Sequence, residues 1–139
     1  MVNTNKLKPP EGDDLSEEER LIPDGPLEPL SKIQEVAKQG RLIPVTNKCI
    51  DDIERLGWSA DEEVRELVLQ LRESNYHRSE WCKISIKKNL VACDAYTIER
   101  YEKYTDSGSS YLCKYYLKFA IGPMGDALLM VSCHDQRKS

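Results

Sequence analysis

The sequence predicts an α+β domain in which N-terminal helices pack on a C-terminal antiparallel sheet. Apolar residues recur with a helical period between residues 30 and 71. From residue 81 onwards they alternate with polar residues, which is the period of a half-buried strand. Helices followed by a run of strands are typical of α+β folds. A sequence in which strands and helices alternate would instead indicate a parallel sheet.

Residues 1–29 are predicted to be a disordered acidic leader. They contain five of the seven prolines, together with three basic and eight acidic residues. Their few apolar side chains bury too little surface to offset the entropy lost on ordering. Residues 30–139 are therefore assigned to one folded domain, which is an ordinary size for a single core.

Three helices are predicted, over residues 31–40, 46–57 and from residue 59 to residue 71. Each begins at a residue that can cap a helix, and the first two end at glycine. The starts are marked by Ser31 with Gln34, by Thr46, and by Ser59 with Glu62, and the ends by Gly40 and Gly57.

About four strands should follow, joined by short turns and one longer polar loop. The predicted strands cover residues 81–86, 90–97, 111–121 and 127–133, with turns at 87–89 and 122–126 and a loop at 98–110.

Several classes of protein are disfavoured by what the sequence does not contain. No apolar run approaches the roughly 20 residues that span a bilayer, and no secretory signal is recognisable, so we expect a cytoplasmic protein that does not bind membranes. The five cysteines show no C-x-x-C spacing, so neither disulfides nor a zinc site is expected. No nucleotide-binding or hydrolase motif occurs, and we expect no metal and no cofactor.

The strand predicted over residues 111–121 has one apolar side and one cationic side. Lys114, Tyr116 and Lys118 share the second side, spaced about 7 Å apart by the strand rise. Two ammonium groups beside a phenol suit a nucleic-acid backbone, with the ring available to stack or to transfer a proton. An ordinary solvent-exposed face would show the same pattern, so both interpretations stay open.

Cleavage of RNA without a metal needs a base for the 2′-hydroxyl, a cation for the phosphorane and an acid for the leaving oxygen. Glu80 and His134 are candidates for proton transfer, Arg78 for the cation and Tyr116 for the acid. Each of these residues alone has a simpler structural explanation. The cationic residues predicted to contact RNA are Lys83, Lys114 and Lys118.

An ordered series of short segments resembles the motility quorum-sensing regulator (MqsR-like) toxins from about residue 30 to residue 134. Four of the segments are L-S-K-I at residues 30–33, A-K-Q-G-R at 37–41, L-G at 56–57 and E-S-N-Y-H-R-S at 73–79. C-D-A-Y at residues 93–96 and Y-L-K at 116–118, followed by a turn and an apolar strand, complete the series.

The resemblance implies a RelE-like fold and a metal-independent endoribonuclease that cuts mRNA and is neutralised by a cognate antitoxin protein. The family's active positions fall on Arg78, Cys93, Tyr116 and either His134 or the nearby Arg137 and Lys138, where the family has lysine, glutamine, tyrosine and lysine. The resemblance therefore also implies that Cys93 contacts RNA. Histidine exchanges protons near neutral pH, whereas lysine does not. A catalytically silent domain that binds RNA or protein is the alternative. The acidic leader, residues 1–29, is interpreted either as a solvated tail or as a competitor of RNA for the basic face.

Overall fold

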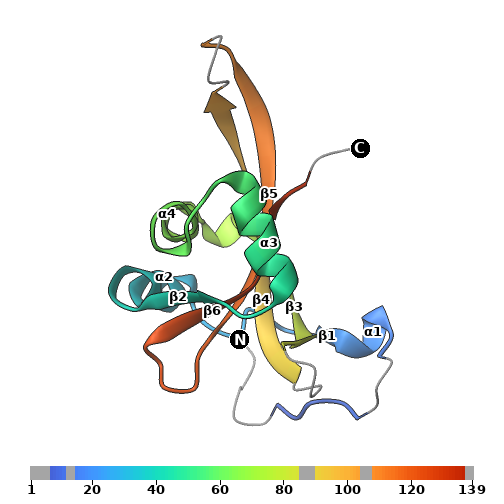
Figure 1. The fold of residues 1–139 in the computed structure, drawn as a ribbon. Coiled ribbons are helices and arrows are strands. Elements are labelled where there is room, and N and C mark those ends of the chain that lie inside the picture. Colours follow the sequence, from blue (N-terminus) through green and yellow to red (C-terminus); the bar gives the residue numbers. More distant parts are fainter. Residues whose placement is uncertain (1–6, 12–14, 85–89, 104–107, 137–139) are drawn as a thin grey trace.

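The structure is a computed structural model that describes residues 7–11, 15–84, 90–103 and 108–136, and its fold is α+β (Figure 1). None of the described helices is long and apolar enough to cross a membrane. The helical elements are α1 (Glu17–Arg20), α2 (Leu30–Gln39), α3 (Asn47–Leu56), the π-helical turn η2 (Ala60–Val64), α4 (Arg65–Gln70) and the 3-10 turn η3 (Glu73–Asn75). The strands are β1 (Leu21–Ile22), β2 (Arg41–Pro44), β3 (Tyr76–Lys83), β4 (Leu90–Lys103), β5 (Ser110–Ile121) and β6 (Ala127–Asp135).

The six strands form one mixed sheet in the order β1-β3-β4-β5-β6-β2. All neighbours are antiparallel except β2, which runs parallel to β6, so the prediction of an antiparallel sheet is wrong at this edge. With only four residues, β2 is too short to show an alternating pattern in the sequence. Pro44 can end this strand because an edge strand does not need every N–H for its neighbour.

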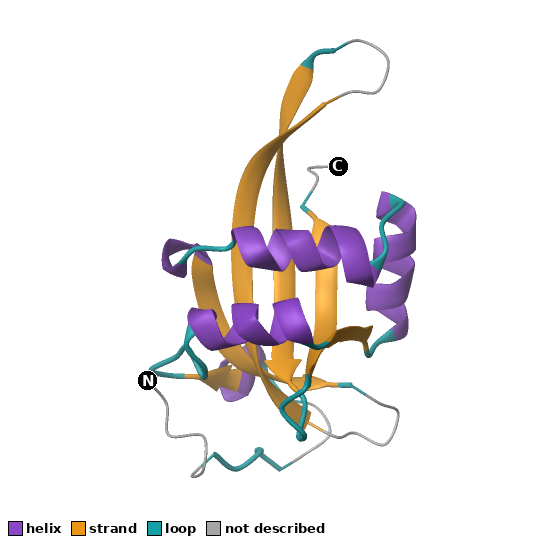
Figure 2. Cartoon of the chain, turned by 90° about the vertical axis from the view of Figure 1, so that its left-hand side faces the viewer, coloured by secondary structure: helices purple, strands orange, loops and turns teal. Residues whose placement is uncertain are grey.

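One buried cluster joins the three longer helices to the sheet, as Figure 2 shows by the helices that cover the strands. Ile33 of α2, Ile53 of α3 and Leu67 of α4 are buried in it together with Leu117 and Phe119 of β5. The predicted apolar side of the long strand therefore faces this core. Its cationic side faces away from it.

Of the three predicted side-chain caps, the one at Thr46 is confirmed, and those at Ser31 and Ser59 do not form. Thr46 caps α3 as predicted, accepting the N–H of Cys49 at 3.0 Å, and Gly57 ends that helix with a φ of 73°. By contrast, α2 begins at Leu30 after Pro29 and makes no side-chain cap. The Gln34 amide instead donates to carbonyls at the end of α4. Gln34 therefore bonds to the end of another helix and not to the start of its own.

The strand bounds differ from the predicted ones most at β3, which begins at Tyr76 and not at residue 81, and at β4, which ends at Lys103 and not at residue 97. β4 and β5 carry the sheet past the helices (Figure 1). β4 continues through residues 98–103 of the loop predicted at 98–110, and its Ile98 and Arg100 pair with Tyr115 and Cys113 of β5. Arg100 also lies over the rings of Trp58 and Tyr115, at 5.4 and 5.2 Å from their centroids. The predicted turn at 87–89 lies outside the described residues.

The leader differs from its predicted disorder over residues 15–29. Here α1 and β1 form, and β1 pairs with β3 at the edge of the sheet. Buried Asp94 of β4 fixes the segment that follows, because its carboxylate accepts the N–H of Leu27 at 3.0 and 3.1 Å and the hydroxyl of Ser79 at 2.5 Å. Gly25 lies where a Cβ atom would overlap the hydroxyls of Tyr76 and Ser79. Close approach of the leader thus requires glycine there.

Candidate active site

A cluster of polar side chains lies on the face of the sheet opposite to the helical core. The strand register brings them together, because Arg78 of β3 and Lys118 of β5 are both Cα partners of Ala95 of β4. Tyr116 of β5 is likewise the partner of His134 of β6. The small side chain of Ala95 leaves room for the longer ones on either side to meet above β4.

Glu80 is the central carboxylate of this cluster, and its side chain is only 2% exposed. It accepts a hydrogen bond from the Lys118 ammonium at 3.1 Å and lies 3.6 Å from a guanidinium nitrogen of Arg78. The Tyr116 hydroxyl also points at it, at 3.5 Å. A buried carboxylate is tolerated only when it is paired. These three partners therefore hold Glu80 in place, and Glu80 in turn positions their side chains.

The surroundings of the cluster keep its donors protonated. Burial opposes the charge of Lys118, but Cys82, Tyr116 and Glu80 outweigh it and raise its pKa above 10.5. Burial opposes the charge of Arg78 too, and a hydrogen bond to Glu17 with the charge of Glu80 raises its pKa. Burial raises the pKa of Tyr116 above 10.0, with Lys118 opposing and Glu80 adding to the effect. Two cations and a neutral phenol therefore face the solvent together at neutral pH.

Both histidines of the chain lie beside Tyr116. His134 stacks on its ring, with centroids 5.3 Å apart and planes 24° apart. His77 meets the same ring edge to face at 6.3 Å. Sequence patterns singled out His134 but not His77, because the first strand was predicted to begin at residue 81. In the structure β3 begins at Tyr76, and a register shift between Tyr76 and Arg78 lets the adjacent residues His77 and Arg78 lie on one side of the sheet.

Arg78 has a second acidic partner, which comes from the leader. Glu17 of α1 accepts a hydrogen bond from its guanidinium at 3.1 Å. The Arg78 Nε atom is buried and has no hydrogen-bond partner in the part of the chain that the structure describes. An arginine with a free donor and an exposed, displaceable partner is well suited to receive a phosphate oxygen.

The residues predicted to contact RNA fall in three different places. Lys114 is exposed on the same face of β5 as Tyr116, and Lys83 lies at the end of β3 beside a cavity that Lys118 also lines. Cys93 differs from the prediction, because its side chain is 0% exposed and cannot contact a ligand at the surface. It packs with Cys82 and Val131 in a small apolar cluster of the sheet.

Arg20 is a cation near the cluster that the sequence patterns did not indicate. It follows the acidic run of the leader, which was expected to be disordered, and no local pattern connects it with β5. In the structure it lines the same cavity as Lys118. Within the described residues, no group of three or more His, Cys, Asp or Glu side chains is placed to hold a metal ion. Compared with known proteins, the chain matches no protein-family model and no curated protein.

Proposed function

We propose that this protein is an endoribonuclease that cuts single-stranded mRNA without a metal, with a RelE-like fold and the toxin role of the MqsR-like family. The observation that carries the proposal is the cluster around Glu80, in which Arg78, Lys118, Tyr116 and His134 face one surface. Cations for a phosphorane, a phenol that can donate and an imidazole that can accept are the groups this reaction needs.

The reaction can be written with these groups alone. His134 takes the proton of a 2′-hydroxyl, and the freed oxygen attacks the adjacent phosphorus. The bond from phosphorus to the 5′-oxygen breaks, and Tyr116 gives that oxygen its proton. The products are a 2′,3′-cyclic phosphate and a 5′-hydroxyl. Proton exchange with the solvent then returns His134 and Tyr116 to their starting states.

Arg78 and Lys118 stabilise the charge that collects on the phosphorane oxygens, as fixed cations do in sites of this kind. Glu80 was expected from the sequence to exchange protons with the substrate. Since its side chain is 2% exposed, we assign it instead to positioning Lys118, Arg78 and Tyr116. Its charge fixes their side chains before the substrate arrives.

The test is cleavage of an end-labelled single-stranded RNA in the presence of a chelator, with analysis of the product ends. We expect cyclic phosphate ends, and we expect Tyr116→Phe to lower the rate by about 100-fold or more, since positioned acids contribute roughly 10²–10⁴. Tyr101→Phe is the matched control, because Tyr101 is 73% exposed on the projecting hairpin. Equal rates for the two variants would contradict the proposed role of Tyr116.

The proposed partner besides mRNA is a cognate antitoxin protein, which the family resemblance implies. The test is induced expression in a bacterial host, where growth arrest is expected. Co-expression of the product of the adjacent reading frame should relieve it. Arrest that persists with the Tyr116→Phe variant would show that toxicity does not come from RNA cleavage.

A catalytically silent domain that binds RNA or protein is the second candidate. It is favoured by the burial of Glu80 and Cys93, because neither side chain can then contact a substrate. Such a domain would bind RNA with the same cations and leave it intact. The cleavage assay therefore separates the two candidates.

A further inference from the structure

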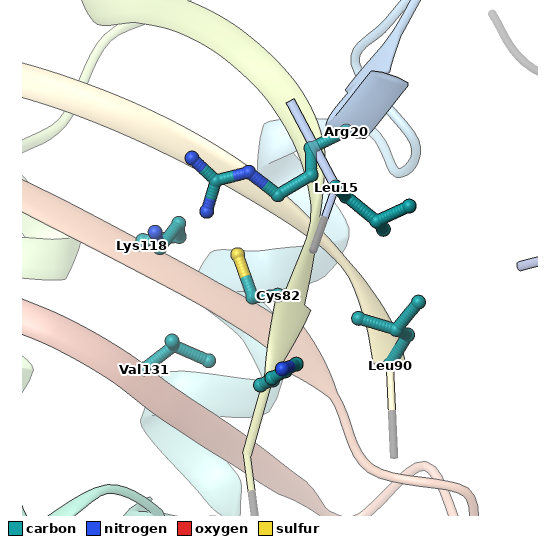
Figure 3. Close-up of a pocket in the computed structure, with 7 residues that line it drawn as sticks. Leu15, Arg20, Cys82, Leu90, Lys118 and Val131 are labelled. Carbon is teal, nitrogen blue, oxygen red and sulfur yellow. The ribbon is translucent and has the colours of Figure 1, made fainter. Parts of the chain in front are cut away.

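A cavity of about 350 Å³ lies on the site face of the sheet, beside Lys118. Three cations line it, namely Arg20, Lys83 and Lys118, and no carboxylate is among its lining residues. Leu15, Leu90 and Val131 give it apolar walls, and Cys82 forms part of its floor (Figure 3). Its size is at the lower end of small-molecule sites, which suits one nucleotide unit and not a duplex.

The Arg20 side chain is directed into this cavity. Figure 3 shows its side chain extending over Cys82 toward Lys118. Its Nε atom is buried and has no hydrogen-bond partner among the described residues. A buried donor without a partner costs free energy, so a fold that keeps one beside a cavity is suited to a ligand that supplies an acceptor.

Lys118 connects the cavity to the candidate active site. Glu80 accepts one of the three hydrogen-bond donors of its ammonium, which leaves others for a ligand on the cavity side. Lys118 and Tyr116 are alternate residues of β5, so their side chains leave the strand about 7 Å apart. That separation is of the order of one step along a nucleic-acid backbone.

We propose that Arg20, Lys83 and Lys118 form a subsite for the phosphate of the nucleotide next to the one that is cut, with its base or ribose against Leu15 and Leu90. The proposal rests on the proposed function, because it places single-stranded RNA on this face. It makes α1 part of the substrate site and not a linker. The guanidinium of Arg20 can offer two parallel donors to a phosphate, which a lysine cannot.

The experiment measures binding separately from cleavage. A fluorescent 2′-O-methyl RNA octanucleotide cannot be cut, because its attacking oxygen is blocked, and its affinity is followed by anisotropy at several salt concentrations. Arg20→Ala is compared with Arg41→Ala, which removes the same charge from the exposed start of β2 at the other edge of the sheet. Circular dichroism verifies that both variants are folded.

We expect Arg20→Ala to bind about tenfold more weakly and to lower the slope of log K against log salt by about 0.7, the value for one phosphate contact to a single strand. Arg20→Lys should recover part of the affinity. Arg41→Ala should leave the slope unchanged. This result would establish the subsite even if ordinary RNA were left uncut, in which case only the proposed function would fail.

Equal slopes for Arg20→Ala and Arg41→Ala, or no binding of the octanucleotide by the unaltered chain, would overturn the subsite even if RNA were cut. Inorganic phosphate and uridine 5′-monophosphate are tested as competitors of the octanucleotide. Stronger competition by the nucleotide, lost in Arg20→Ala, supports a nucleotide subsite. Equal competition by phosphate alone would overturn it in favour of a simple anion site.

Discussion

Replacing Glu80 by glutamine tests whether this carboxylate holds the site together. The change preserves the shape of the side chain but removes the negative charge between Lys118 and Arg78. Lys118 is only 15% exposed, so water cannot fully solvate its ammonium once the partner is gone. Arg78 is 31% exposed and keeps Glu17, so its share of the loss is smaller.

Breaking a buried ion pair by removing one partner costs roughly 3–5 kcal/mol. Because one of the two cations is partly exposed, we expect the lower end of that range, about 3 kcal/mol. At about 4 °C per kcal/mol for a domain of this size, the melting temperature should fall by about 12 °C. Glu28→Gln is the control, because it breaks the exposed pair with Lys32, and exposed pairs contribute at most about 1 kcal/mol.

Calorimetry and urea unfolding of both variants provide the measurement. The double variant Glu80→Gln with Lys118→Met removes both charges, so its cost should be smaller than the sum of the single costs by about 2 kcal/mol. If Glu80→Gln costs no more than Glu28→Gln, the carboxylate does not hold the cluster. Additive single costs would show that Glu80 and Lys118 do not interact.

Three further predictions follow from the leader and from Tyr116. Glu17→Gln should bind RNA more tightly than Glu18→Gln, by less than about fivefold, because Glu17 is 68% exposed and its pair with Arg78 is screened; equal affinities by anisotropy would show that Glu17 does not compete. Gly25→Ala should cost about 1–3 kcal/mol in urea unfolding, because its Cβ atom would overlap two hydroxyls of the sheet, and an unchanged midpoint would refute that close approach. The phenol of Tyr116 has a raised pKa and so stays protonated as pH rises through 10; its absorbance titration, taken as the difference from Tyr116→Phe, should have a midpoint above 10.0.

The parts of the fold that the sequence predicted are those that local physics determines. Thr46 and Gly57 mark α3 correctly because a cap and a left-handed residue act within one turn of the helix. The buried side of β5 follows directly from alternation. Gln34 and the pairing of β2 with β6 were missed because their partners lie far along the chain, where no local pattern records them.

The site was predicted in part for the same reason. Tyr116 and Lys118 share a strand, so spacing alone places them together. His77 was missed because β3 begins at Tyr76, before the predicted strand, and because a register shift brings His77 to the same side as Arg78. Glu80 was assigned to the substrate from residue type and Cys93 from the family resemblance, and only the packing of strands shows that both are buried.

In the leader, the amino-acid composition gave no sign of the contacts that the structure shows. Glu17 and Arg20 are three residues apart in α1, which places their side chains on neighbouring positions of one helix face. One holds Arg78 and the other reaches the cavity beside Lys118. Under the proposed function, an RNA phosphate that displaces Glu17 from Arg78 would remove one acidic contact and leave Arg20 in place for the next phosphate. The acidic run need not then oppose RNA binding, because α1 carries both the competing carboxylate and a cation.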